Sequence, residues 1–352
     1  MKLCFLGDAG SIHTVRIADY FAKKGHDVSL IGFDNPGIKK VKYCQLKKHF
    51  SFMDLNYPDN IPLLNKYLMQ IKPDLLHAHY ATSYGFMAAF SGFHPFLLTC
   101  WGSDILVTPK KNPFLRALTR HVLNKADAVT CDSEDMKSEI EELSDKGAKI
   151  SKVYFGPEEK VLGVKPKKHN LKSILSLRGL ESNYNIDKII AAFSVLIADG
   201  EKAKLVILGE GRKKEALLRL TELKGLSALV EFKGRVKNNL IPHYLSLSDV
   251  VVSVPSSDST AASLLEAMAA GCIPVVSGIP ANKEWVKEKV NGFIADDLDP
   301  EPLGYILRMA LNNANISKMR KNNKEKVRKY GTFEKNMQVV EKIYFSLTKR
   351  KK

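Results

Sequence analysis

Short apolar runs alternate with amphipathic stretches along the whole chain. The first run covers residues 2–7, a glycine-containing loop and an amphipathic stretch at 14–24 follow, and a second apolar run covers 26–33. Short and continuously apolar runs are typical of strands buried on both faces of a parallel sheet, whereas the stretches between them have helical spacing. The opening of the chain therefore predicts a β-loop-α-β unit of the Rossmann type.

A segment of prolines and charges at 156–170 interrupts this alternation and is typical of a linker. A second series of apolar runs begins directly after it, so the chain is predicted to be an α/β protein with two Rossmann-like lobes facing a cleft. The expected domains are residues 1–164 and 165–330. The predicted strands are 2–7, 26–33, 74–80, 97–104, 128–131, 173–177, 204–208, 230–232, 249–254, 273–276 and 291–294, and the predicted helices are 14–24, 112–125, 133–144, 186–198, 212–224, 262–270, 302–312, 316–328 and 333–347.

The most specific stretch, residues 253–280, combines the end of a strand, a polar turn and a helix. The turn at 256–260 holds small and acidic side chains, which are expected to accept hydrogen bonds from the free amides of a helix start. Strong helix formers fill 262–270, and Gly271 ends the helix. A helix that begins at the carboxyl end of a parallel strand points its free N–H groups into the crevice above the sheet, which predicts an anion site there.

Two acids bracket this predicted anion site. Asp258 lies in the turn, seven residues separate it from Glu266 on the helix, and the motifs Ala-Met-Ala-Ala-Gly and Pro-Val-Val come afterwards. This stretch resembles the retaining nucleotide-sugar glycosyltransferases of family 4, which have the GT-B fold. The resemblance implies that Glu266 holds the ribose of the nucleotide and that Asp258 contacts the donor sugar. The alternative is that Asp258 only caps the helix and that Glu266 is a solvated helix residue.

The resemblance extends over nearly the whole chain and implies a division of roles between the lobes. The C-terminal lobe is expected to bind the nucleotide sugar and the N-terminal lobe the acceptor, with the final segment, 331–352, packing back on the N-terminal lobe. Arg178 is expected to neutralise the donor diphosphate, and the loop at Gly10 and Ser11 to approach it across the cleft. The implied nucleotide-sugar contacts are Gly10, Ser11, Arg178, Gly209, Glu210, Gly211, Asp258, Ser259, Thr260, Ser263, Leu265 and Glu266.

Three positions depart from the family pattern. Asp258 stands where the family usually has Glu, and Trp101 stands where members often have histidine. Tyr184 stands near the position of the lysine that, in the family, is the second cation at the diphosphate. A histidine at a strand end is usually structural, yet the resemblance places two strand ends along the acceptor side of the cleft. The catalytic candidates are therefore Asp258, Arg178, His79 and Asp104.

The chain carries 54 Lys and Arg against 38 Asp and Glu, a formal net charge of +16. A nucleic-acid module would interleave aromatic residues with its basic patch or show a known motif, and the sequence has neither, so nucleic acid is not an expected partner. An anionic membrane surface and a solvated surface without a partner remain open. Each lysine or arginine near an anionic leaflet contributes ~1 kcal/mol to membrane binding, so the high basic content favours the membrane interpretation. The expected contacts are Lys110, Lys111, Arg116 and Arg120 on or before the amphipathic helix 112–125, and the C-terminal residues 349–352.

Other chemistries find little support in the sequence. The GxGxxG fingerprint of a dehydrogenase is absent after the first strand, and the Asp-x-Asp at 297–299 falls in a late loop, so no cofactor and no metal are expected. The five cysteines are scattered, as in a reducing compartment. Apolar runs stay short of the ~18 to 20 residues of a membrane span, and the short first run does not resemble a signal peptide. We expect a cytoplasmic protein that associates peripherally with the inner face of the membrane.

The predicted function is a retaining, metal-independent hexosyl or N-acetylhexosaminyl transferase. Its donor would be a nucleotide sugar, and its acceptor a glycan, in particular a lipid-linked glycan of surface polysaccharide synthesis. Two alternatives remain open: a GT-B nucleotide-sugar epimerase, which needs no acceptor, and a non-catalytic subunit that binds a sugar nucleotide or polysaccharide.

Overall fold

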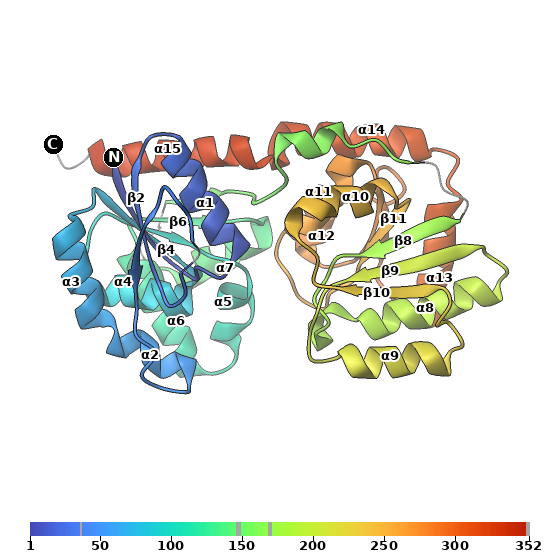
Figure 1. Ribbon diagram of the computed structural model, residues 1–352, viewed down its shortest axis with the longest axis horizontal. Helices are drawn as coiled ribbons and strands as arrows, with labels where there is room; N and C mark the ends of the chain where they lie inside the picture. The colour runs from blue at the N-terminus through green and yellow to red at the C-terminus, as the bar shows by residue number, and fades with distance from the viewer. Residues whose placement is uncertain (36, 146–148, 168–170, 350–352) are drawn as a thin grey trace. The chain divides into compact units, whose positions relative to one another are not determined.

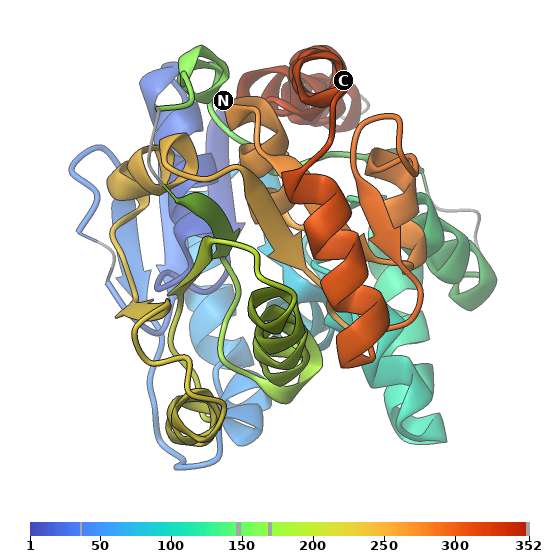
Figure 2. The same cartoon turned by 90° about the vertical axis from the view of Figure 1, so that its right-hand side faces the viewer.

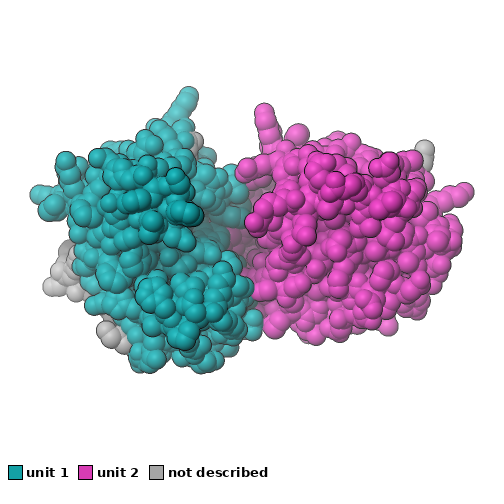
Figure 3. Space-filling view, turned by 90° about the horizontal axis from the view of Figure 1, so that it is seen from below, with its two compact units in different colours: residues 1–153, 336–352 teal, residues 154–335 magenta. Residues whose placement is uncertain are grey.

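The computed structural model describes residues 1–35, 37–145, 149–167 and 171–349, which form two compact units. Unit 1 is Met1–Val153 together with the residues from Asn336 onward, and unit 2 is Tyr154–Lys335. Figure 3 colours the two units separately. Each unit has its own sheet and its own buried core, so each is described by itself below.

Unit 1 contains, in its described part, a sheet of seven parallel strands in the order β3-β2-β1-β4-β5-β6-β7 (Figure 1). The order runs outward from β1 in one direction and from β4 in the other, so the direction of winding reverses between these two strands. Ligands of open parallel sheets bind outside the carboxyl ends of the strands at such a reversal. The strands are β1 (Lys2–Leu6), β2 (Asp27–Gly32), β3 (Lys42–Gln45), β4 (Leu75–His79), β5 (Phe96–Thr99), β6 (Ala128–Cys131) and β7 (Ile150–Lys152).

Helices cover both faces of this sheet. On one face Phe5 of β1 packs against Phe21 of α1, which in turn contacts Tyr344 of α15, with ring centroids 6.2 and 4.9 Å apart. On the other face the alternate strand residues, among them Leu6 and Leu76, join a buried cluster with α3, α4, α6 and α7. The helices are α1 (Ile12–Lys23), α2 (Met53–Asp59), α3 (Ile61–Ile71), α4 (Gly85–Ser91), α5 (Ser103–Leu106), α6 (Pro113–Lys125), α7 (Glu134–Leu143) and α15 (Phe333–Thr348).

Unit 2 contains, among its described residues, a sheet of six parallel strands in the order β10-β9-β8-β11-β12-β13. Here the reversal of winding falls between β8 and β11, which pair through Ile174 with Val250 and Leu175 with Val251. The loops that follow these two strands therefore open at the same edge of the sheet. The strands are β8 (Lys172–Ser176), β9 (Ala203–Leu208), β10 (Val230–Gly234), β11 (Val250–Ser253), β12 (Ile273–Ser277) and β13 (Phe293–Ala295).

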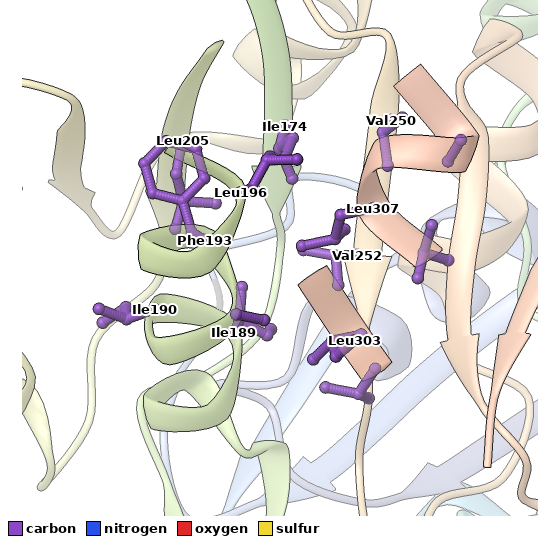
Figure 4. Packing of buried hydrophobic residues seen from close by; sticks show 14 of the residues in the cluster. Ile174, Ile189, Ile190, Phe193, Leu196, Leu205, Val250, Val252, Leu303 and Leu307 are labelled. Atoms are coloured by element: carbon purple, nitrogen blue, oxygen red, sulfur yellow. The ribbon is translucent and has the colours of Figure 1, made fainter. Parts of the chain in front are cut away.

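One face of the second sheet is covered by α8, α9 and α13, with α8 and α13 side by side (Figure 2). Phe193 and Leu196 of α8 lie near Leu205 of β9, and Leu307 of α13 lies near Val252 of β11, all within one buried cluster (Figure 4). Alternate strand residues such as Val251 face α10, α11 and α12 on the other side. The helices of this unit are α8 (Ile186–Ala198), α9 (Lys214–Leu223), α10 (Ile241–Ser246), α11 (Ala262–Ala270), α12 (Pro280–Trp285), α13 (Pro300–Leu311) and α14 (Ile316–Lys326).

The two Rossmann-like units confirm the predicted α/β class, and several predicted details are wrong. The predicted strand at 97–104 ends at Thr99, because Ser103 already begins α5. The predicted linker contains a 3-10 helix, Glu159–Gly163, whose Val161 is buried in the core under α11, and its residues 168–170 lie outside the described part of the chain. The periodicity did not predict β3, β7 or the helices α2, α3, α4, α10 and α12.

The boundary between the units falls at Val153, before the predicted boundary at residue 164. The reason is that Tyr154 packs on Trp285 of unit 2, with ring centroids 5.0 Å apart. The C-terminal helix α15 begins in unit 2 and continues into unit 1, where Tyr344 is fully buried. The Tyr344 hydroxyl lies 2.7 Å from Nδ1 of His77 on β4, so a buried polar contact ties the helix to the first sheet.

Candidate functional site

The candidate site lies where β8 and β11 of unit 2 end, at the reversal of winding. Arg178 follows β8, and Asp258 follows β11, so the two predicted residues emerge at neighbouring positions of one sheet edge. A guanidinium nitrogen of Arg178 donates to Oδ2 of Asp258, and the other terminal nitrogen lies 3.3 Å from Oγ of Ser263 in the first turn of α11. The structure thus brings Arg178 to an acid and a helix start that lie 80 and 85 positions further along the chain.

Arg178 is held in place by its surroundings. Its side chain is only 11% exposed, and its Cζ lies 4.3 Å from the centre of the Tyr184 ring. An arginine stacked on an aromatic face is stabilised by the negative quadrupole of the ring. Tyr184 therefore contributes a ring, and no charge, close to the place where the family resemblance implies a lysine.

Burial and charge act in opposite directions on Asp258. Desolvation raises the pKa of its carboxyl above the usual range, and the nearby guanidinium of Arg178 and the Ser259 N–H, 3.0 Å from Oδ1, oppose that shift. A carboxylate beside a positive charge keeps its ionised form. The pair in this state holds one positive and one negative charge next to each other.

The helix after Asp258 starts later than the capping prediction requires. Helix α11 begins at Ala262, so its N-cap position falls on Ala261, one residue past the polar turn 256–260, and the Ala261 side chain makes no capping hydrogen bond. Asp258 binds Arg178 and does not cap the helix. The positive dipole end of α11 lies at the edge where Arg178 contacts Ser263 of its first turn.

The remaining candidate residues of α11 and its turn lie close to the helix start. Ser259 and Thr260 are buried in the turn, and Ser263 contacts Arg178. Leu265 is fully buried in the core, so its side chain holds the helix and only its backbone is available to a ligand. Glu266 is partly buried one turn further along.

Two glycines let the loop after β9 approach the loop after β8. Gly209 has a φ of 147°, and a Cβ there would lie 2.3 Å from the carbonyl oxygen of Arg178. A Cβ on Gly211 would lie 2.4 Å from the carbonyl oxygen of Leu180. Glu210 between them is exposed, and its carboxylate lies 3.0 Å from Nζ of Lys214. A larger residue at Gly209 would collide with the backbone of Arg178, and one at Gly211 with the backbone of Leu180.

Two asparagines that the sequence did not single out join the loops after β8 and β11. Asn183 donates to the carbonyl of Ser257 at 2.7 Å and accepts from the Ser257 N–H at 3.1 Å. Asn185, in the left-handed region with a φ of 52°, donates to the carbonyl of Val254 at 2.8 Å. These contacts fix both loops around Arg178. The only available signal was the pair of asparagines flanking Tyr184, since asparagine tolerates the left-handed conformation.

The candidates of unit 1 lie at the reversal between β1 and β4. The N–H of Gly10 donates to the Asp8 carboxylate at 2.9 Å, and the Ser11 N–H to the Asp8 carbonyl at 3.1 Å, so the loop is an Asp-stabilised turn in front of α1. Ser11 is the N-cap of α1 without a side-chain cap bond. The approach of Gly10 and Ser11 to a donor diphosphate stays a prediction.

His79 is buried at the end of β4, near His77 of the same strand and His13 of α1. Burial and the neighbouring His13 lower the pKa of His79 to about 3, and burial and Arg16 lower the pKa of His13 to about 4. Nδ1 of His79 lies 3.0 Å from the Thr14 hydroxyl, and its Nε2 has no hydrogen-bond partner among the described residues. These histidines are therefore neutral at physiological pH.

Asp104 is fully buried and acts on the backbone around it. Its carboxylate accepts hydrogen bonds from the N–H groups of Ala81, at 2.8 Å, and Trp101, at 3.0 Å. Desolvation raises its pKa to about 6, against the effect of these hydrogen bonds. Asp104 thus holds the loops after β4 and β5 together, and Trp101, whose ring lies 5.5 Å from His79, is positioned by it. A catalytic role for Asp104 stays a prediction.

The basic residues around α6 are engaged in ion pairs with acids of and after α7. Lys110 lies 2.6 Å from Glu139, Arg116 lies 3.0 Å from Glu142, and Arg120 pairs with the next acid of the chain. Of the apolar residues of α6, Val122 and Leu123 are buried in the core of unit 1, whereas Phe114 is 72% exposed. Lys110, Arg116 and Arg120 are thus paired with acids, and the expected contact of this helix with an anionic membrane stays a prediction.

A further cluster of basic residues, at 318–329, is also partly structural. Nζ of Lys324 donates to the carbonyl of Val164 at 2.8 Å, and Nζ of Lys326 to the carbonyl of Glu284 at 2.6 Å. Of the C-terminal basic residues, those at 350–352 lie outside the described part of the chain. Within the described part, no helix is both long and apolar enough to cross a membrane.

Two family models match the chain, one in each half. The model described as glycosyl transferase 4-like matches residues 2–133, and the model described as glycosyl transferases group 1 matches residues 158–330. Together with the two Rossmann-like units, these matches define a GT-B glycosyltransferase. The chain belongs to the group 1 glycosyltransferases, as its Asp258 and Glu266 motif predicted.

Relatives and solved structures agree with this assignment. The chain is 24% identical over 316 residues to N-acetyl-alpha-D-glucosaminyl L-malate synthase of Bacillus anthracis, covering 83% of this chain and 81% of that protein. It is 25% identical over 192 residues to alpha-monoglucosyldiacylglycerol synthase of Streptococcus pneumoniae, covering 51% of this chain and 43% of that one. The crystal structure of Anabaena HepE in complex with UDP-glucose superposes with a TM-score of 0.81 at 16% identity, covering 99% of this chain and 100% of that one, which shows a shared fold.

Proposed function

We propose that this glycosyltransferase moves a hexosyl or N-acetylhexosaminyl group from a nucleotide sugar to a glycan acceptor, with retention of configuration and without a metal ion. The observation that carries the proposal is the contact of Arg178 with Asp258 and Ser263 at the start of α11. An arginine at a helix N-terminus is a site for a diphosphate, because the guanidinium and the free amides both attract negative charge. Glu266 on the same helix would hold the ribose.

In the proposed reaction the donor diphosphate replaces Asp258 as the partner of the Arg178 guanidinium. The bond between the anomeric carbon and the phosphate oxygen breaks, and its electron pair stays on the diphosphate. The acceptor hydroxyl oxygen bonds to the anomeric carbon on the same face, and its proton passes to the departing phosphate. Arg178 and the α11 amides stabilise the charge that develops on this leaving group, which is the work a metal ion does in other transferases. Asp258, released from Arg178, would contact the donor sugar.

We propose a lipid-linked glycan of surface polysaccharide synthesis as the acceptor, bound by unit 1 at the inner face of the membrane. The name of the streptococcal relative, a synthase that makes a glucosylated diacylglycerol, supports a lipid-bearing acceptor. The neutral cluster of His79, His13 and Trp101 at the reversal between β1 and β4 supplies rings and nitrogen atoms suited to sugar hydroxyls.

A binding-only subunit is the second candidate, and one observation favours it. With Tyr184 in place of a lysine and Asp258 paired with Arg178, the net charge beside the diphosphate position is low. Nucleotide release from a donor, at a rate above its spontaneous hydrolysis, contradicts this candidate. Release without any acceptor points instead to an epimerase-like chemistry.

The test combines donor identification with a matched pair of variants. A thermal-shift panel of UDP-, GDP- and ADP-sugars identifies the donor, and nucleotide release is then measured with and without acceptor and in EDTA. Arg178→Gln should abolish donor binding, whereas Arg212→Gln, an arginine 91% exposed in the neighbouring loop, should leave it intact. Product NMR reports the anomeric configuration. Activity lost in EDTA and restored by Mn²⁺, or an inverted product, refutes the corresponding part of the proposal.

A further inference from the structure

Residues 47–55 of unit 1, which we call the Phe52 loop, present four large apolar side chains to solvent. Phe50 is 46% exposed, Phe52 77%, Met53 38% and Leu55 50%. Single exposed apolar residues are ordinary on protein surfaces, but four within six positions form a patch, and such patches mark sites of interaction. The loop leads from β3 into α2 in unit 1 (Figure 1).

The backbone of the Phe52 loop is held from within the unit by two asparagines that are each only 1% exposed. Asn56 accepts from the N–H of Phe50 at 3.0 Å and donates to the carbonyls of Phe50 and Phe52 at 2.8 and 3.2 Å. Asn60 accepts from the Lys47 N–H and donates to the Lys47 carbonyl, both at 2.9 Å. The shape of the loop therefore does not depend on its apolar side chains, which remain outside the core.

Satisfied backbone groups matter for the choice of partner. A loop that enters the headgroup region of a bilayer loses water, and each backbone group without a partner costs free energy there. Because Asn56 and Asn60 already supply those partners, the Phe52 loop enters an apolar environment at a lower cost than an ordinary loop. Phenylalanine and leucine are side chains that bury well at the boundary between headgroups and acyl chains.

The charges beside the patch are suited to an anionic surface. Lys47 and Lys48 precede the apolar residues, and both are exposed. Lys48 lies 2.8 Å from Asp34, with both side chains at least half exposed, and an exposed ion pair of this kind is weak enough to exchange for a lipid phosphate. Asp54 is the one acid between the apolar residues.

We propose that the Phe52 loop is a membrane-docking surface, in which the four apolar side chains enter the interface of an anionic bilayer and Lys47 and Lys48 contact lipid phosphates. The inference deepens the proposed function, because it names the surface through which unit 1 would reach a lipid-linked acceptor. Docking itself requires no donor, acceptor or turnover.

The test uses the full-length protein and sedimentation with two kinds of vesicle, phosphatidylcholine alone and equal parts of phosphatidylcholine and phosphatidylglycerol. The wild type should bind the anionic vesicles, and less so as salt rises, because exposed charges are screened over ~8 to 10 Å at physiological salt. Phe50→Ser with Phe52→Ser should lower binding tenfold or more, and Lys47→Gln with Lys48→Gln should remove the preference for anionic lipid. Leu223→Ser, at a position 85% exposed in unit 2, is the matched control and should change nothing.

A second variant keeps the proposal testable if the double serine variant misfolds. Phe52→Trp preserves the apolar surface and should give tryptophan fluorescence that anionic vesicles shift to the blue and brominated lipids quench, beyond the signal of Trp101 and Trp285. Unchanged sedimentation of a folded double variant, or an unquenched tryptophan, overturns the proposal. So does a dimer that the serine variant dissociates while vesicle binding stays absent. A protein that docks but transfers no sugar leaves the docking surface intact and refutes only the proposed function.

Discussion

Replacing Tyr184 by leucine tests whether an aromatic ring takes over part of the role of a second cation in the donor site. The ring lies 4.3 Å from Cζ of Arg178, whose terminal nitrogens reach Asp258 and Ser263. Leucine keeps the apolar volume but removes the quadrupole that attracts the guanidinium. Without the ring, we expect Arg178 to lose its fixed orientation toward the diphosphate.

The size of the effect follows from the burial of the arginine. Cation–π contacts contribute about 0.5 to 1 kcal/mol when exposed and about 2 kcal/mol when desolvated. With Arg178 only 11% exposed, the upper part of this range applies, about 1 to 2 kcal/mol. Tyr184→Leu should therefore lower kcat/KM by roughly 5- to 30-fold. Tyr184→Phe keeps the ring and should stay close to the wild type.

The assay is acceptor-dependent nucleotide release, together with calorimetry of the free nucleotide. A matched control exists in the same unit, because Arg308 lies 5.5 Å from the ring of Tyr305, which is 53% exposed and on α13. Tyr305→Leu should leave kcat/KM unchanged. The reasoning fails if Tyr184→Leu keeps full activity, or if Tyr184→Phe loses as much as Tyr184→Leu, since that result would assign the effect to the hydroxyl.

Three further predictions concern the ribose contact, the C-terminal helix and pH. Glu266→Gln should weaken nucleotide binding by roughly 10- to 150-fold through the loss of a charge-assisted hydrogen bond of ~1.5 to 3 kcal/mol, measured by calorimetry; unchanged affinity would contradict the ribose role. Tyr344→Phe leaves Nδ1 of His77 without its partner at 2.7 Å and should lower the free energy of unfolding by ~1 to 3 kcal/mol in urea titrations, where no change would refute the buried contact. Acidification from pH 6.5 to 4 should destabilise unit 1, because the unfolded chain protonates three histidines whose folded pKa values are lowered. Asp104 opposes this loss of stability over part of the pH range, because its folded pKa is raised to about 6. It is a single group, however, and the three histidines together outweigh it. Thermal unfolding that is independent of pH in this range would refute the assignment of neutral histidines.

Local sequence determined most of the regular structure in unit 2. The predicted helices at 186–198 and 262–270 have the same bounds as α8 and α11. In each, a run of strong helix formers is followed by a turn or by a glycine that accepts the left-handed conformation, and both signals are local. The acid pair Asp258 and Glu266 predicted the family for a similar reason, since the spacing along a strand, turn and helix is itself local. Such features depend on neighbours in the chain, and the sequence contains them directly.

Tertiary structure decided which distant residues meet. The reversal of winding between β8 and β11 brings Arg178 to Asp258, and Asn183 and Asn185 then lock the two loops. Asp258 was predicted to cap its helix or to bind a sugar, and a partner eighty positions away could not be deduced from spacing. The distribution of charge over the surface could not be deduced from the sequence for the same reason.

The net charge of +16 was known from the sequence, but its distribution was not. Only packing showed that Lys110, Arg116 and Arg120 pair with acids of and after α7, and that four exposed apolar side chains lie close together around Phe52. The physical reason is that composition and periodicity describe each residue along its own element, whereas ion pairing, burial and exposure depend on elements that the chain separates and the sheet brings together.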